Sequence, residues 1–353
     1  MSDVESVASL GAGSRATVTD SMVRVDLHTA AGRDNERLIR PILAAATLFS
    51  GLIVGLVIVF VVWRSIPAWH AEGLKFLTRD GWDTQLENAW NSSDSWPFFG
   101  AWPLLAGTIL TTLGAVIVST FIGVGAAVFI AEIAPGWLRR PIETIVQLLA
   151  GVPSVVFGLV GLAVIVPYIA NHWVPGNSGD VLTDVSLDGT CLLAAVAVLS
   201  FMILPFFVTV AVDSLRAVPR SYLDGGLALG MTRWRTITRI QIPTAMPGLL
   251  AGIMLAAARA IGEAIAISMV GGSLAYVPNL VHGPLYFLLE PLRTMASAIV
   301  DTGSDAADVP AIAAALFALA SVLLVFSLTL SLLARWVFTA YNRRLNVDTG
   351  RHV

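Results

Sequence analysis

The sequence predicts an all-α integral membrane protein with six transmembrane helices. Composition is the first observation behind that prediction: of the 353 residues, 56% are hydrophobic and 13% are charged, and the mean hydropathy is +0.79. Soluble domains carry about 25% charged residues, so a single water-soluble domain is excluded. The apolar residues also come in long blocks, and roughly 20 apolar residues in a helix cross a hydrocarbon core about 30 Å thick.

Six of these blocks are long enough to cross a membrane. They lie at residues 42–63, 104–131, 144–169, 190–212, 249–270 and 310–333. Small residues such as Gly123 and Gly125 recur within them and let neighbouring helices approach closely, which predicts a packed bundle. Pro153, Pro167 and Pro205 fall inside the expected spans, where they predict local kinks or breaks.

The distribution of cationic residues supports the same number of spans. Most of the 21 Lys and Arg residues fall in residues 1–41, around Arg139, in residues 213–248 and in residues 334–353. Six spans place all these segments on one side of the membrane, and the positive-inside rule makes that side the cytoplasm. The polar N-terminal tail 1–41 is expected to be disordered, and residues 334–353 are expected to form a cytoplasmic C-terminal tail.

Single residues exclude several other functions. Lys75 is the only lysine and follows Leu74, so the chain lacks the Gly-Lys pair of a phosphate-binding P-loop and is not itself a P-loop ATPase. Cys191 is the only cysteine, and we expect a buried, inert thiol. The histidines show no metal-ligand spacing, so no metal site is expected. A net charge of −3 gives no indication of a nucleic-acid partner.

The expected external loop, residues 64–103, is rich in tryptophan. It contains Trp69, Trp82, Trp90, Trp96 and Trp102. These side chains are typical of an aromatic belt at the membrane surface. Tryptophan is also favoured at protein interfaces, so a docking surface for an extracytoplasmic partner is the second interpretation.

The loop at residues 213–248 is the most informative part of the sequence. Pro219 suits the first turn of a helix, and Gly230 suits its end, because glycine tolerates the left-handed geometry of a C-terminal cap. A second amphipathic helix is expected to follow, and Pro243 and Pro247 are expected to stop it before the next span. Two short helices at a bend could fit another protein's groove, or could lie on the membrane with arginines on lipid phosphates.

This loop resembles the EAA loop of bacterial ABC importer permeases, in which Glu-Ala-Ala is followed by three residues, Gly, nine residues and Ile-x-Leu-Pro. The corresponding positions here are Asp224, Gly225, Gly226, Gly230, Ile240 and Pro243. The resemblance implies the type I ABC importer permease fold, and it implies that residues 222–232 form the coupling helix, which seats in a separate ATPase subunit. Asp replaces Glu, and Ile replaces Leu. Two glycines replace the alanines, and each glycine lowers helix stability by about 1 kcal/mol.

Three further stretches are similar to the phosphate-specific transport permeases of the PstC type. They are residues 36–43, residues 131–162, with Glu-Ile-Ala-Pro-Gly-Trp-Leu-Arg-Arg-Pro, and residues 258–272, with Arg-Ala-Ile-Gly-Glu. The resemblance covers most of the chain from residue 36 onward. It implies a permease subunit for inorganic phosphate in the bacterial cytoplasmic membrane, with both termini in the cytoplasm.

Arg259 and Glu263 are the candidate residues of the substrate pathway. They lie four apart in an expected span, which places them on one helical face, and a mid-membrane charge costs about 2.5–3.5 kcal/mol. They could form a mutual ion pair without a transport role. Alternatively, Arg259 helps an oxyanion pass while Glu263 offsets its charge; the resemblance favours this second interpretation. Glu132 and Glu143, which flank Arg139 and Arg140 at a span boundary, are expected to be local salt bridges or helix-end charges rather than a site.

The resemblance also implies partners. They are a homologous second permease of the PstA type, a PstB-type ATPase dimer, an extracytoplasmic phosphate-binding protein and membrane lipid. No cofactor is expected in this chain, since ATP and Mg²⁺ would bind the ATPase, and no catalytic residue is expected. The alternatives are a permease for sulfate, molybdate or phosphonate, an ion-driven carrier, and a membrane scaffold; secondary carriers usually show repeated halves, and no internal repeat is visible.

Overall fold

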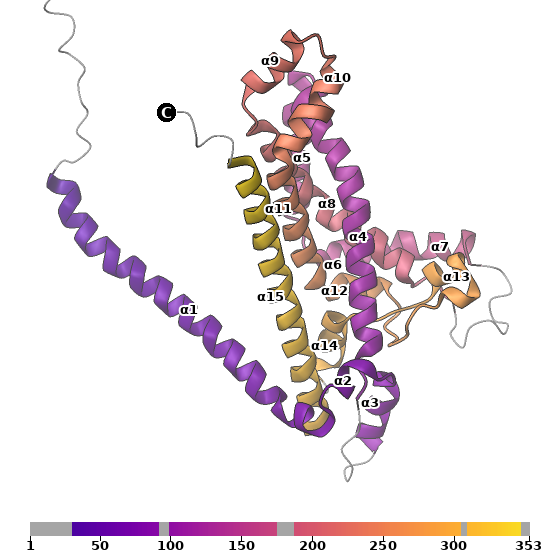
Figure 1. Ribbon diagram of the computed structural model, residues 1–353. Helices are drawn as coiled ribbons and strands as arrows, with labels where there is room; N and C mark the ends of the chain where they lie inside the picture. Colours follow the sequence, from indigo (N-terminus) through magenta and orange to yellow (C-terminus); the bar gives the residue numbers. More distant parts are fainter. Residues whose placement is uncertain (1–29, 92–98, 175–186, 305–308, 347–353) are drawn as a thin grey trace, which may run out of the picture. The chain divides into compact units, whose positions relative to one another are not determined.

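The computed structural model describes residues 30–91, 99–174, 187–304 and 309–346, and it contains helices and loops but no strand within those ranges. The chain divides into an N-terminal unit, Met1–Val59, and a second unit, Phe60–Val353, which we call the core unit. In the N-terminal unit the described residues belong to the first helix, α1, which extends from Ala30 to Glu72 (Figure 1).

The remaining helices follow in chain order. They are α2 (Lys75–Thr78), α3 (Trp82–Asn91), α4 (Trp102–Val128), η1 (Phe129–Ile133), α5 (Gly136–Ala150), α6 (Ser154–Val160), η2 (Gly161–Ile165), α7 (Val166–His172), α8 (Leu192–Arg216), α9 (Arg220–Ala228), α10 (Arg233–Thr236), η3 (Ile237–Gln241), α11 (Ile242–Ile261), α12 (Ile265–Val270), η4 (Leu280–His282), α13 (Pro284–Leu289), α14 (Met295–Gly303) and α15 (Pro310–Asn346). Of these, η1, η2 and η3 are single π-helical turns, and η4 is a 3₁₀ turn.

The predicted number of spans is confirmed. Six helical segments within the described residues are long and apolar enough to cross a membrane. They are Arg40–Glu72, Trp102–Ile133, Ser154–His172, Leu192–Arg216, Arg233–Ile261 and Pro310–Leu333. The protein is therefore a multi-pass membrane protein.

The predicted boundary of the N-terminal tail is wrong. Helix α1 begins at Ala30, so residues 30–41 are helical rather than part of a disordered tail, and residues 1–29 lie outside the described ranges. The predicted sixth span, 310–333, coincides with the candidate span Pro310–Leu333, and helix α15 continues beyond it to Asn346. Residues 347–353 also lie outside the described ranges.

The third span is broken at Pro153, as its proline predicted, and the fifth span is broken where a continuous helix was expected. The expected third span, 144–169, is divided between α5 and α6, because Pro153 ends the helical path and caps α6. The expected fifth span, 249–270, ends at Ile261 and resumes as α12 at Ile265. Pro167 follows the π turn η2, whereas Pro205 is accommodated inside α8, which continues as one helix.

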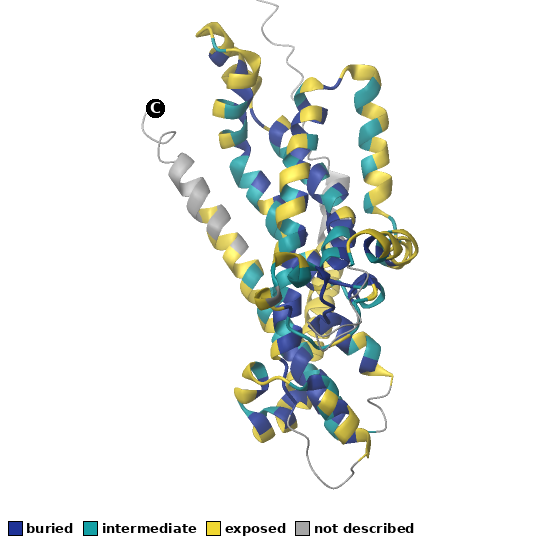
Figure 2. Ribbon diagram, turned by 90° about the vertical axis from the view of Figure 1, so that its right-hand side faces the viewer, coloured by how far each residue is buried: buried dark blue, intermediate teal, exposed yellow. Residues whose placement is uncertain are grey.

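Helix α8 forms the centre of the core unit. It packs against α4, α5, α11 and α12, and most of its span is buried (Figure 2). Residues at the closest approaches are small: Gly123 of α4 lies against Phe207, and Gly161 lies against Val198. The predicted close packing is thus confirmed for Gly123, whereas Gly125 faces open space.

Within the core unit, α9 and α10 lie at one end and α2 and α3 at the other (Figure 1). At the α2–α3 end, Trp82 is fully buried and its ring packs against those of Phe76 and Phe99. The Nε1–H of Trp69 donates to Ser321 Oγ of α15 at 3.2 Å. These two tryptophans are therefore part of the packed core rather than of a surface belt, whereas Trp90 and Trp102 are exposed and Trp96 lies outside the described residues.

Candidate functional site

The loop at residues 213–248 forms two helices at a bend, as predicted. Helix α9 begins directly after Pro219, and Gly230 follows its end with a φ of +81°. The Gly230 N–H donates to the Leu227 carbonyl at 2.9 Å, which closes the last turn in the manner of a left-handed cap. Thr232 then caps α10 by accepting the Arg235 N–H at 3.4 Å.

The second helix of the loop does not stop where it was predicted to. Residues Arg233–Ile261 form one candidate span, and Pro243 and Pro247 lie inside it. Pro243 sits in the first turn of α11, directly after the π turn η3, where proline is tolerated. The loop is therefore mechanically continuous with the fifth span.

Of the EAA-like positions of the loop, the fold brings Gly226 and Ile240 together. Asp224 and Gly225 are exposed on α9, whereas Gly226 is buried against the segment that enters the span. A Cβ added at Gly226 would lie 2.8 Å from Ile240 Cδ1, which is closer than real contacts allow. Gly226 thus lets α9 lie directly on η3, so one of the two unexpected glycines has a packing reason.

The outer surface of the loop is apolar and cationic. Leu229 is 85% exposed and Trp234 is 62% exposed, and Arg233 and Arg235 flank Trp234. Asp224 and Trp234 also line a cavity of about 340 Å³ between this loop and η1. Contiguous exposed apolar side chains with a polar rim are typical of protein interaction sites.

The structure places Arg259 and Glu263 differently from the prediction. Gly262 ends α11, so Glu263 lies in the break before α12 and not one turn along the helix from Arg259. Among the described residues no ion pair joins the two. The Arg259 guanidinium carbon lies 5.9 Å from the centroid of the Phe206 ring, and Glu263 Oε1 accepts the Ala266 N–H at 3.3 Å.

The two broken spans meet beside this point. Helices α6 and α12 pack against each other, and a Cβ added at Gly158 would lie 2.9 Å from Ala266 Cα. Non-helical backbone at membrane depth is tolerated where it is buried in protein or lines a polar cavity. Arg259 is exposed in this chain, so its guanidinium is available to groups outside the chain.

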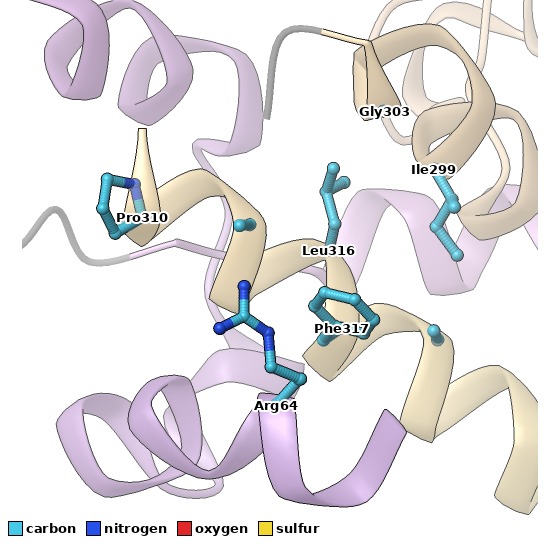
Figure 3. A pocket seen from close by; sticks show the side chains of 8 residues that line it. Arg64, Ile299, Gly303, Pro310, Leu316 and Phe317 are labelled. Atoms are coloured by element: carbon cyan, nitrogen blue, oxygen red, sulfur yellow. The ribbon is translucent and has the colours of Figure 1, made fainter. Parts of the chain in front are cut away.

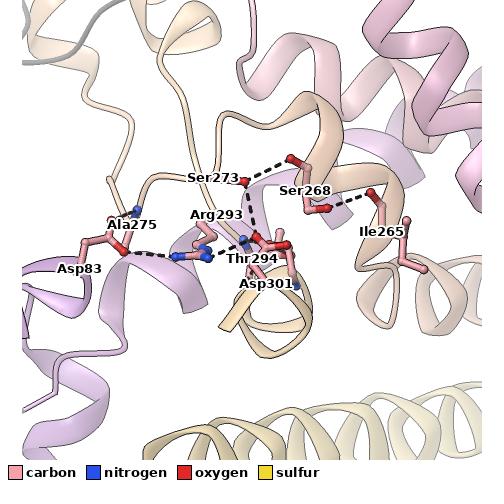
Figure 4. A network of polar contacts seen from close by, with 9 residues as sticks. Asp83, Ile265, Ser268, Ser273, Ala275, Arg293, Thr294 and Asp301 are labelled. Atoms are coloured by element: carbon pink, nitrogen blue, oxygen red, sulfur yellow. Dashed lines mark hydrogen bonds and ion pairs between the residues drawn. The ribbon is translucent and has the colours of Figure 1, made fainter. Parts of the chain in front are cut away.

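An ion network that the sequence analysis missed lies in the loops near α3 and α14 (Figure 4). Arg293 is 10% exposed at its side chain and bonds Asp83 Oδ1 and Asp301 Oδ2, each at 3.2 Å. Asp83 also accepts the Ala275 N–H at 2.7 Å, and Ser273, with a positive φ of 51°, donates to Asp301 at 3.4 Å. Asp83 lies 210 residues from Arg293 in sequence, so no local pattern indicates that it completes the network.

A second cavity, of about 480 Å³, lies among the ends of α1, α14 and α15 in the core unit (Figure 3). Its walls are mainly apolar, and the Arg64 guanidinium carbon lies 5.4 Å from the centroid of the Phe317 ring. None of the predicted site residues lines this cavity.

Cys191, one residue before α8, is buried as predicted, and burial raises the pKa of its thiol to about 11.

Six apolar spans and an exposed two-helix loop that continues into one of them fit a membrane permease, and the family model and relatives make it a permease of the ABC importer class. The chain belongs to the family of binding-protein-dependent transport system inner membrane components, whose family model matches residues 119–347.

Two relatives and one solved structure show how far the likeness extends. The phosphate transport system permease protein PstC of Mesorhizobium japonicum is 30% identical over 87% of this chain and 89% of that protein. The probable ABC transporter permease protein YqgH of Bacillus subtilis is 38% identical over 54% of this chain and 58% of that protein. A bacterial ABC transporter for import of the acidic polysaccharide alginate aligns with a TM-score of 0.49, 17% identity and coverage of 86% of this chain and 99% of that chain.

Proposed function

We propose that this chain is the PstC-type permease subunit of an ABC importer that moves inorganic phosphate into the cytoplasm. The observation that carries the proposal is the likeness to a phosphate transport permease over 87% of this chain. The chain itself performs no covalent chemistry, and ATP with Mg²⁺ binds a separate ATPase.

The proposed assembly follows from the two ends of the core unit. The exposed α9–α10 loop lies in the cytoplasm and is the element that binds a PstB-type ATPase dimer. Both termini lie on the same side, in line with the positive-inside rule. A PstA-type permease completes the pathway. An extracytoplasmic phosphate-binding protein delivers the anion to residues 64–103 and 271–309, where α2, α3 and the Arg293 network lie.

The proposed pathway passes Arg259. Its planar guanidinium offers paired donors to phosphate oxygens, and among the described residues it has no acidic partner that would occupy them. Glu263, four residues away in the chain, limits the positive charge of the route, so the anion is passed on rather than held.

Substitutions in the loop test the coupling role. We expect Asp224→Lys and Gly230→Val to separate ATP hydrolysis from phosphate uptake in the reconstituted transporter, because the first reverses a charge at the interface and the second strains a left-handed turn. The matched controls are Asp224→Glu, which keeps the charge, and Gly230→Asn, which tolerates that turn. Normal uptake in both disruptive variants would refute the coupling role.

The cargo is tested by competition. Uptake of labelled phosphate by the complete transporter is measured with an excess of sulfate, molybdate or a phosphonate. We expect unlabelled phosphate to compete and the other three anions to leave uptake unchanged. Stronger competition by one of them would reassign the permease to that oxyanion.

A further inference from the structure

The loop and three spans meet at one buried hydrogen-bonded junction. Glu132 Oε1 accepts the side-chain Nε2–H of Gln241 at 2.6 Å, and the same Nε2 donates to the Leu215 carbonyl at 3.2 Å. Glu132 lies at the end of the α4 span, Leu215 near the end of α8, and Gln241 at the point where the loop enters α11. The side-chain amide of Gln241 therefore links its own span to the spans of α4 and α8.

Burial makes the loss of a hydrogen-bond partner at this junction costly. Gln241 is 1% exposed, so its side-chain amide cannot exchange its partners for bulk water without movement, whereas Glu132, with 8% of its side chain exposed, also lines the cavity of about 340 Å³ beside the loop. Buried polar groups that lose a partner carry the full cost of desolvation. Arg220 also approaches Glu132, but it lies 3.7 Å away and is 71% exposed, which makes it a weak partner.

Both residues of the junction sit in π-helical turns. Glu132 belongs to η1 and Gln241 belongs to η3. Such turns are frequent at functional sites, and each one locally changes which way a helix presents its side chains. Here the two turns direct a carboxylate and an amide at each other across 109 residues of sequence.

The acidic side chains near this junction bond partners other than those expected. Glu132 and Glu143 were expected to pair locally beside Arg139. Instead Glu143 pairs with Arg216 at the end of α8, and Arg139 donates to the Ala131 carbonyl of η1 at 3.0 Å. The acids of this region therefore hold the loop and its flanking spans together.

We propose that Glu132 and Gln241 are positioning residues that make α4, α8 and α11 move together with the coupling helix α9. This role rests on the proposed permease function. Helix α9 lies against Ile240 of η3 at Gly226, so a displacement of α9 reaches Gln241 through its chain neighbour Ile240. The Glu132–Gln241 bond then passes that displacement to α4, and the Leu215 contact passes it to α8.

The test uses the complete transporter in proteoliposomes with phosphate-loaded binding protein, and it measures phosphate moved per ATP hydrolysed. We expect Glu132→Leu and Gln241→Leu each to lower this ratio roughly threefold or more, and the double variant to be no worse than the lower single, as for coupled neighbours. Glu132→Gln keeps an acceptor for Gln241 and is expected to retain most of the ratio.

A reciprocal exchange separates positioning from mere support of the fold. Gln241→Glu places two carboxylates together and should lower the ratio most, and adding Glu132→Gln restores a donor–acceptor pair and should raise the ratio again. Recovery is expected to be partial, because the Leu215 carbonyl still lacks its donor. A purely structural role would instead lower the yield of assembled transporter and leave the ratio of the remainder unchanged.

The outcomes distinguish this inference from the proposed function. Asp224→Lys is assayed in parallel. If it uncouples the transporter while all Glu132 and Gln241 variants keep the wild-type ratio, the positioning role of the junction is refuted and the coupling role of the loop is retained. If Asp224→Lys and Gly230→Val are also without effect, the coupling role of the loop in the proposed function fails as well.

Discussion

Two neighbouring glycines of α9 occupy opposite surroundings. An added Cβ at Gly225 would meet no atom within 4 Å, whereas one at Gly226 would approach Ile240 and Thr236. Gly225→Ala is therefore expected to stabilise the protein by about 0.5–1 kcal/mol, because alanine favours helix over the unfolded chain. Gly226→Ala is expected to give no such gain. Thermal unfolding in detergent compares the two, and an equal rise in Tm for both would contradict the packing argument.

Sequence reasoning predicted the candidate site only where the signal was local. Gly230 was predicted because a left-handed turn favours glycine, and the structure has φ of +81° there. The pairing of Arg259 with Glu263 assumed an unbroken helix, and Gly262 ends that helix between them. Gln241 occupies the unspecified position of the motif, and its partner Glu132 lies 109 residues away, so no local spacing could indicate the pair.

At the scale of the elements, the Arg293 network holds three segments together: α3, the stretch before α14 and α14 itself. Arg293 is nearly buried, and its Nε has no partner among the described atoms. The two ion pairs with Asp83 and Asp301 therefore supply most of the interactions that offset the lost hydration of its charge. Ser273 adds a hydroxyl to the same network from a strained backbone position. The network therefore fixes the loops at the end of the core unit opposite α9.

Removing the cation should loosen that end. Arg293→Met is expected to lower the free energy of unfolding by about 2 kcal/mol, less than for a fully buried pair because Asp83 is partly exposed. Asp83→Asn keeps an acceptor and should have a smaller effect. Denaturant unfolding in detergent measures both, and equal, negligible shifts would show that the network contributes no stability.

The six spans were predictable because length and apolar composition are properties of a whole block. The break at Pro153 was predicted from its proline, whereas the break at Gly262 was not, because other glycines of the spans, such as Gly252, lie within intact helix. Pro205 and Pro247 show the converse: each lies inside a continuous helix. Neighbouring helices decide whether a proline or glycine interrupts a span, and the sequence alone does not contain those neighbours.

On the scale of the whole molecule, the exposed loop and the exposed Arg259 both need companions. Purification of the chain from its native membrane is expected to bring an ATPase subunit with it, because Leu229 and Trp234 are poorly suited to water. The chain reconstituted by itself is expected to show no uphill uptake on an ion gradient. Accumulation of phosphate by the lone chain under such a gradient would favour an ion-driven carrier and would contradict the assembly.

The contact of Gly226 with Ile240 joins the exposed loop to the first residues of a membrane helix. The atom nearest to a Cβ added at position 226 is Ile240 Cδ1, the tip of a flexible side chain, which can move aside. An alanine at position 226, as in the motif that the loop resembles, therefore fits beside an isoleucine at position 240 after a small displacement. The glycine in this chain sets how closely α9 approaches the membrane helix, and so it sets the height at which the loop stands above the membrane.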